Sequence, residues 1–274
     1  MCYIKSVKKV FNIIIYIFAI VGFFLTAGYV AVRLGLTNTR GIIDNQRQDF
    51  LSGTATSTPE WASLPEWQTL KMAILKDKGL IDSASQTSGV PSRLIVAELA
   101  TEQMRFFFDD RESYKKFFEP LKILGSQTQF SWGVMGIKEE TALQIEKNLK
   151  DTTSPFYLGS KYENLLDFNT ATSTGITDQR FIRMTDQHAH YYSYLYAGLY
   201  LKQIETQWKN AGFNISNRPD ILSTLYNIGF KNSKPNANPQ SGGAEIPIAG
   251  KTYSFGSFAG AFYNSNELLM EFPR

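Results

Sequence analysis

The sequence predicts a mainly α-helical domain that follows one N-terminal transmembrane helix and carries a small irregular or hairpin insertion near its C-terminus. Three observations lead to this fold class: a long apolar stretch near the N-terminus, helical spacing of apolar residues from Thr69 onward, and a Pro/Gly/Asn-rich segment late in the chain. With 274 residues, 43% of them hydrophobic, the chain is long enough to bury one sizeable core.

The N-terminal apolar stretch covers residues 10–32 and contains one strongly polar side chain, Asn12. As a helix it would be about 34 Å long, enough to cross the roughly 30 Å hydrocarbon core of a bilayer. The alternative, a cleavable signal peptide, has a shorter apolar region and a small-residue cleavage site, so we expect an uncleaved anchor. The three lysines within residues 1–9 predict a cytoplasmic N-terminus, with the C-terminal domain on the outer side of the cytoplasmic membrane.

Charge is spread unevenly along the chain. Residues 1–40 contain five basic side chains and no acidic one, so the net charge of +3 leaves 3 − 5 = −2 for the rest. Nucleic-acid binding needs a basic face, which a near-neutral body lacks, so we exclude nucleic acid as a partner. The single cysteine, Cys2, precedes the apolar stretch, so the outer domain has no disulfide and depends on its core.

The composition divides the chain into four parts. These are a cytoplasmic N-terminus (1–9), the transmembrane anchor (10–32), a Ser/Thr/Pro-rich linker (33–66) and one folded domain (67–274). Trp61 and Trp67, near the end of the linker, are expected to dock it onto the domain.

The first helices of the domain follow from apolar spacing and from end signals. A helix is expected over residues 90–107. Pro91 lies in its first turn, where the missing backbone N–H of proline costs no hydrogen bond. Residues 138–150 place Ala142, Ile145 and Leu149 on one side of a helix with acids in its first turn.

The later elements follow from the same signals. A long helix is expected over 185–212, opened by Thr185 or Asp186 and stopped by Gly212. A shorter one is expected over 218–230, and the segment 231–256 allows at most one short hairpin. A final helix is expected over 257–269.

An acid inside an apolar helix is the feature most directly related to function. Glu98 and Glu102 lie four residues apart and share one helical stripe with Arg105. A carboxyl group among apolar neighbours is desolvated, which favours its protonated form, as a general acid requires. The alternative is that Glu102 pairs with Arg105 or with a neighbouring helix and has no catalytic role.

Four segments together resemble the soluble lytic transglycosylases, a family with the lysozyme-like fold. The helix GVPSRLIVAELATEQ keeps the family's spacing of five positions between an alanine, Ala97, and the glutamate, Glu102. The segment GVMGIKEETA (133–142) is similar to the family's Gly-Leu-Met-Gln-x-x-Pro-x-Thr-Ala segment. YAGLYLKQI resembles its Gly-x-x-Tyr-Leu helix, and LYNIG matches its Ala-Tyr-Asn-x-Gly motif. The four follow the family's order and cover roughly residues 88–230.

This resemblance implies a membrane-anchored lysozyme-like domain that cleaves the MurNAc–GlcNAc β-1,4 bond of peptidoglycan glycan strands. Glu102 would serve as the single general acid and base and give a 1,6-anhydro product without water. The implied substrate-binding residues are Gly133, Met135, Gly136, Tyr226 and Asn227. Tyr226 would position Glu102 or the substrate, unless it is a core tyrosine, and Asn227 is more typical of a loop brace. No metal or cofactor is implied.

The sequence departs from the family's pattern at three positions. Gln103 replaces the serine after the glutamate, Gly136 replaces the cleft glutamine, and Glu139 replaces a proline. Two further hypotheses stay open, the first of them suggested by Gln103 and Gly136. One is a wall-tethered glycan-binding module with weak or no turnover. The other is a hydrolytic muramidase in which Asp109 or Asp110 supplies the second carboxylate.

Aromatic and histidine side chains crowd the helix expected over 185–212. An i, i+4 stripe predicts core packing for Tyr192, Tyr196, Tyr200, Ile204 and Trp208. Tyr191 and Tyr194, off that stripe, are better placed to stack on sugar rings. His188 and His190, two apart, point to different sides of a helix, so we expect no metal site.

Overall fold

The computed structural model describes residues 59–108, 131–170, 172–186 and 188–274, with isolated residues between Tyr16 and Ala27. The chain divides into two units, of which the larger, Arg40–Asp110 with Ser131–Arg274, is compact. The larger unit contains all of the elements described below.

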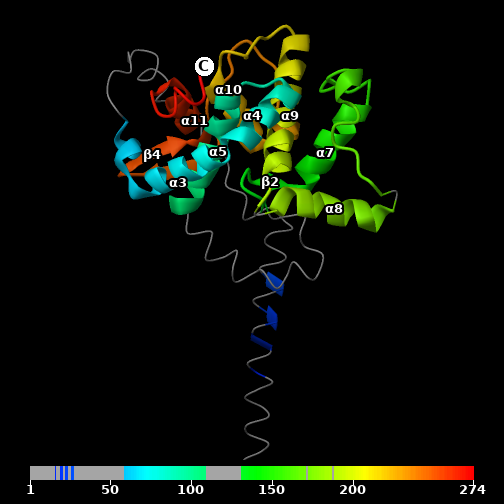
Figure 1. Ribbon diagram of the computed structural model, residues 1–274, viewed down its shortest axis with the longest axis horizontal. Coiled ribbons are helices and arrows are strands. Elements are labelled where there is room, and N and C mark those ends of the chain that lie inside the picture. The colour runs from blue at the N-terminus through cyan, green and yellow to red at the C-terminus, as the bar shows by residue number, and fades with distance from the viewer. Residues whose placement is uncertain are drawn as a thin grey trace, which may run out of the picture. The chain divides into compact units, whose positions relative to one another are not determined.

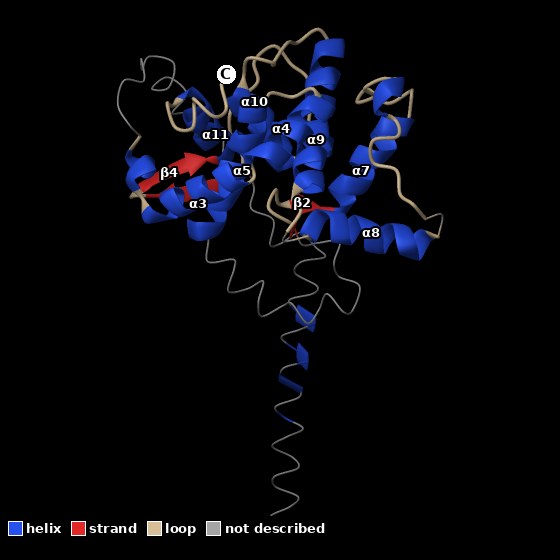
Figure 2. Cartoon of the chain, viewed as in Figure 1, coloured by secondary structure: helices blue, strands red, loops and turns tan. Residues whose placement is uncertain are grey.

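The larger unit is mainly helical, as the sequence predicts (Figures 1 and 2). Its α-helices are α3 (Pro65–Lys76), α4 (Lys78–Ser88), α5 (Ser92–Phe108), α7 (Glu139–Lys150), α8 (Ser173–Thr185), α9 (Tyr191–Asn210), α10 (Pro219–Ile228) and α11 (Phe255–Asn264). Short 3-10 helices cover Glu60–Ser63, Ser160–Tyr162 and Phe230–Asn232. The helix with Ala142, Ile145 and Leu149 on one side is confirmed as α7, where all three are buried.

The strands are short and antiparallel. β3 (Glu245–Ile248) pairs with β4 (Lys251–Ser254) in the register Glu245 to Ser254, which confirms the expected hairpin. β1 (Ser131–Trp132) pairs with β2 (Ile137–Lys138), a ribbon that the sequence did not predict. Two residues per strand leave no alternation of apolar and polar positions to detect.

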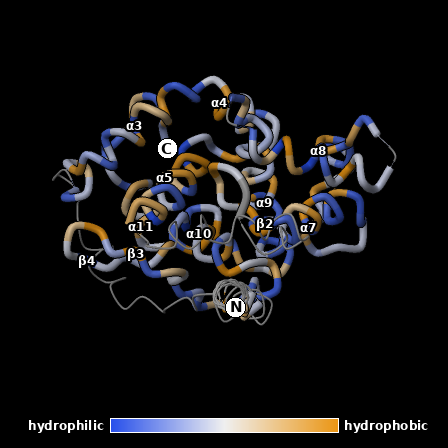
Figure 3. The backbone as a smooth tube through the Cα atoms, turned by 90° about the horizontal axis from the view of Figure 1, so that it is seen from below, coloured by the Kyte–Doolittle hydropathy of each residue, from blue (hydrophilic) through white to orange (hydrophobic). Residues whose placement is uncertain are grey.

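Helix α5 lies in the interior of the unit, where it contacts α3, α4, α9, α10, α11 and β3 (Figure 3). Twelve of its 17 residues are buried, so over most of its length it has no solvent face. Of the predicted aromatic stripe on α9, four side chains are fully buried and Tyr192 is half-buried. The core is therefore built around α5, the helix that carries Glu102.

The start of α9 differs from the prediction. Thr185 ends α8, and the Asp186 carboxylate accepts the backbone N–H groups of His188 and Ala189 at 2.8 and 3.2 Å. This turn separates two helices, and α9 begins only at Tyr191. The predicted opening by Thr185 or Asp186 is wrong because the Asp186 side chain closes a turn here instead of capping a helix.

The last helix is also displaced from its predicted bounds. Ser254 and Ser257 form a capping box that starts α11 at Phe255, and the helix ends at Asn264. The prediction extended it to residue 269 because the apolar spacing continues. Carbonyl groups beyond Asn264 instead accept hydrogen bonds from Arg93 of α5.

The end of the predicted linker packs against the domain. Trp61 and Trp67 are buried, their rings meet edge to face at 4.9 Å, and Trp61 also contacts Phe258 of α11 at 5.2 Å. Helix α3 already includes Pro65 and Glu66, which the composition assigns to the linker.

The predicted anchor over residues 10–32 lies outside the described residues except for isolated positions. Within the described residues, none of the helices combines the length and the apolar character that crossing a membrane demands.

Candidate active site

Glu102 lies on the buried face of α5, six residues before the end of the helix. It is 3% exposed, and Glu98, one turn earlier, is completely buried. The neighbouring side chains Leu99, Ala100 and Met104 are buried as well. The predicted apolar surroundings of Glu102 are confirmed.

Arg105 is the ionic partner of Glu102. Its Nη2 lies 2.5 Å from Oε1 of Glu102 and its Nε lies 3.3 Å from Oε2, a two-pronged contact between residues three apart on the helix. Both side chains are shielded from solvent, so separating the two charges would cost substantial free energy. The alternative in which Glu102 pairs with Arg105 is therefore realised in this structure.

The turn between β1 and β2 faces Glu102. Gly136 has φ +62°, and a Cβ built on it would lie 1.9 Å from Oε1 of Glu102. A Cβ built on Gly133, which has φ +63°, would likewise lie 1.9 Å from the Met184 carbonyl oxygen of α8. Only glycine allows both the left-handed backbone and these contacts. The absence of a side chain at Gly136 lets the turn lie directly on the carboxylate.

Gln103 holds the same turn from α5. Its Nε2 donates to the Val134 carbonyl at 2.6 Å. Met135, the next residue, is completely buried, whereas Gly133 is exposed. The departure from the family's serine at this position thus gives a side chain long enough to reach the turn.

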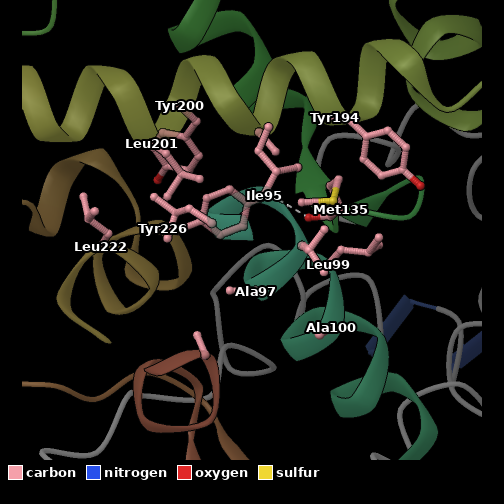
Figure 4. Close-up of a cluster of buried hydrophobic side chains, with 14 of the residues drawn as sticks. Ile95, Ala97, Leu99, Ala100, Met135, Tyr194, Tyr200, Leu201, Leu222 and Tyr226 are labelled. Carbon is pink, nitrogen blue, oxygen red and sulfur yellow. Dashed lines mark hydrogen bonds between the residues drawn. The ribbon is translucent and has the colours of Figure 1, made fainter. Parts of the chain in front are cut away.

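Tyr226 reaches the turn from α10. Its hydroxyl donates to the Met135 carbonyl at 2.8 Å, and its ring lies 4.9 Å from that of Tyr200 on α9. Figure 4 shows Tyr226 beside Tyr200 and directed toward Met135. Burial, with the nearby carboxyl groups of Glu98 and Glu102, raises the pKa of Tyr226 well above its usual value. The hydroxyl therefore stays protonated and fixes the turn that covers Glu102.

Asn227, the neighbour of Tyr226, acts on a different segment. Its Oδ1 accepts the backbone N–H of Ala244 at 2.9 Å, just before β3. Gly243 packs against the same amide group, where an added Cβ would lie 3.0 Å from Oδ1. Asn227 braces the loop that leads into the hairpin, as one of its two sequence interpretations predicts.

Glu98 is a functional candidate that the sequence did not single out. Its Oε1 accepts a short hydrogen bond from the Ser223 hydroxyl of α10, while its Oε2 is buried and has no hydrogen-bond partner among the described residues. Burial raises the pKa of Glu98 to about 8; the Ser223 hydrogen bond opposes this shift and the charge of Glu102 adds to it. Glu98 is thus a neutral acid at pH 7. Its position four residues before Glu102 was the only sequence signal.

The tyrosines proposed as sugar platforms have other roles. Tyr194 is 2% exposed and its hydroxyl donates to Asp77 at 2.7 Å, so it cannot present a ring to substrate. Tyr191 is half-buried and pairs with Thr87 at 3.1 Å. His190 Nδ1 lies 2.5 Å from Asp77, which joins α9 to the α3–α4 junction.

Two further expectations concern metal ions and a second carboxylate. Over the part of the chain that the structure describes, His, Cys, Asp and Glu side chains form no group of three or more that could hold a metal ion. Asp109 and Asp110, the candidates for a second carboxylate, lie outside the described residues.

Comparisons of the chain with protein-family models, with curated proteins and with solved structures found no match. Glu102, the turn from Gly133 to Gly136, and Tyr226 come from three separate segments and form one contact cluster, which is the basis for a functional proposal.

Proposed function

We propose that the chain is a membrane-anchored peptidoglycan lytic transglycosylase with a lysozyme-like domain outside the cytoplasmic membrane. The observation that supports this most is the direct contact of Gly136 with Glu102, in a turn whose Met135 carbonyl is bound by Tyr226. The four resembling segments include all of these residues. Nothing else in the described residues groups an acid with a glycine turn in this way.

The proposed reaction needs one carboxyl group. Glu102 donates its proton to the glycosidic oxygen as the bond between C1 of MurNAc and that oxygen breaks. The resulting carboxylate then removes the proton of the 6-hydroxyl, whose oxygen bonds to C1. The products are a 1,6-anhydro-muramoyl end and a free 4-hydroxyl on GlcNAc. No water is consumed, so a second carboxylate to activate water is not required.

Arg105 sets a condition on this mechanism. A general acid must carry a proton, and a carboxylate held by a guanidinium does not donate one. The Arg105 side chain, now 2.5 Å from Glu102, must move away when the glycan binds. Contact with substrate would supply the free energy for this separation.

The same ion pair favours one competing function. If Arg105 stays on Glu102, the domain binds glycan strands without cleaving them and serves as a wall-tethered module. The 3% exposure of Glu102 is consistent with such a role. The two proposed functions, cleavage of the glycan and binding without cleavage, therefore differ in whether Arg105 separates from Glu102.

The test is to incubate the full-length chain with purified murein and to identify the released muropeptides by mass spectrometry. We expect anhydro-muropeptides from the wild type and none from Glu102→Gln. Glu140→Gln, which changes an exposed acid on α7, is the matched control and should behave as the wild type. Murein that is bound but released uncut would favour the binding module. Reducing MurNAc ends would favour a hydrolytic muramidase.

A further inference from the structure

Glu98 combines features that packing alone does not require. It is a fully buried carboxyl group between α5 and α10, with one oxygen hydrogen-bonded to Ser223 and the other without a partner among the described residues. An apolar side chain of similar size would avoid the cost of burying that second oxygen. The acid therefore adds to the structure a specific connection to Ser223.

Ser223 connects Glu98 to the site around Glu102. It lies three residues before Tyr226 on α10, so both side chains belong to the same face of that helix. Tyr226 in turn binds the Met135 carbonyl, in the turn that brings Gly136 onto Glu102. The rotation and height of α10 relative to α5 determine whether Tyr226 reaches the turn.

We propose that Glu98, through the hydrogen bond that it accepts from Ser223, is a positioning residue that holds α10 in the register in which Tyr226 fixes the turn over Glu102. This rests on the proposed function for its catalytic consequence, but the positioning itself can be measured without activity. The sequence resemblance does not assign a role to this position.

The charge state of Glu98 controls this connection. Among the described residues, the ionisable groups that act on it are Glu102 on its own helix, Tyr200 on α9 and Tyr226 on α10, and the nearby guanidinium of Arg105 is bound to Glu102. Ionisation places a second negative charge beside the Glu102–Arg105 pair and the two phenols. Because that charge is buried while the Ser223 hydrogen bond favours it, we expect the position of α10 against α5 to change above about pH 8.

The first experiment is an NMR titration of the methionine methyl groups in the full-length chain. We expect the buried Met135 methyl to shift with a midpoint near pH 8, while the Met270 methyl, which is 92% exposed, stays constant. In Glu98→Gln, which keeps an oxygen for Ser223 but does not titrate, the Met135 shift should disappear. Glu245→Gln, at an exposed acid on β3, should titrate as the wild type.

The second experiment separates positioning from packing. Glu98→Leu fills the same space without an acceptor for Ser223, so murein cleavage should fall at least tenfold, and Glu98→Gln should restore it relative to leucine. A constant Met135 signal in the wild type would overturn the proposal, as would equal cleavage by the leucine and glutamine variants. If no variant cleaves murein but Met135 titrates as expected, the proposed function fails while the positioning role of Glu98 stands.

Discussion

Gly136 and Glu102 approach each other so closely that the site leaves no room for the glutamine of the resembling family. A Cβ at Gly136 would lie 2.4 Å from the carboxyl carbon of Glu102 as well as 1.9 Å from Oε1. Any side chain here must displace either the acid or the turn. Glycine in place of the family's glutamine is therefore required by the position that the Glu102 side chain takes in the structure.

Replacing Gly136 by alanine should therefore lower the free energy of unfolding by more than the backbone strain alone would. Gly250 provides the control, because it has a similar φ, +77°, but open space around its Cβ position. Gly250→Ala should lower the free energy of unfolding by about 1 kcal/mol, the cost of a left-handed residue with a side chain. Gly136→Ala should lower it by at least twice as much and also reduce murein cleavage. Urea unfolding of both variants gives the comparison, and equal losses would contradict the contact.

At the residue scale, the sequence predicted environments better than partners. The burial of Glu102 follows from the apolar residues around it on one helix. The hydrogen bond of Tyr226 to Met135 joins residues 91 apart, which no local pattern contains. The pairing of Glu102 with Arg105 was open from the sequence, because spacing allows a bond without requiring it.

The elements at the C-terminal end of the chain are held by one buried arginine. Arg93 of α5 is completely buried, and its guanidinium donates to five main-chain carbonyl groups at 2.7 to 3.1 Å: those of Phe262, Tyr263, Ser265, Glu267 and Phe272. These include carbonyls at the end of α11 that have no partner within the helix. Arg93 thus fixes where α11 stops and how the tail returns to the core.

Arg93→Lys should therefore destabilise the domain although it keeps the charge. An ammonium group has three donors, so at least two of the five carbonyls lose their partner, at about 1–3 kcal/mol each. We expect the free energy of unfolding to fall by about 3 kcal/mol in urea. Arg274→Lys is the control, because Arg274 bonds carbonyls of the same segment from an exposed position and should cost less than about 1 kcal/mol. Similar losses in the two variants would argue against this role of Arg93.

Sequence signals predicted the ends of a helix correctly where the residues that end it lie within the helix or next to it. Pro219 and Gly229 bound α10 as predicted, because each acts on its own backbone. The ends of α8 and α11 depend on a side-chain turn at Asp186 and on Arg93, more than 160 residues before the end of α11. Such distant partners leave no periodic trace in the sequence.

The stability of the whole molecule should depend on pH through Glu98. Its pKa is about 8 in the folded state and 4.5 in the unfolded chain, so the folded state keeps a proton that the unfolded chain releases between these values. Its contribution to stability is full below pH 4.5, falls as the pH rises toward 8 and is constant above that. The total loss is of order 5 kcal/mol from the difference of 3.5 pH units. Glu98→Gln should abolish this slope in urea unfolding series, and an unchanged slope would contradict it.

For the domain as a whole, only the fold class could be predicted from the sequence. Composition and spacing indicated a mainly helical body with one late hairpin, and both are present. The central place of α5 follows from its lack of a solvent face, which the sequence shows as a nearly continuous apolar run. The ribbon of β1 and β2, which carries Gly133 and Gly136 to the acid, is too short to predict from its own residues.

The claim that Glu102 cleaves glycan strands without water is tested most directly by digestion of murein in water enriched in heavy oxygen. The full-length wild type should release fragments whose new ends are anhydro sugars free of the label, and Glu102→Gln should release none. Labelled reducing ends, or release that survives Glu102→Gln, would contradict the account.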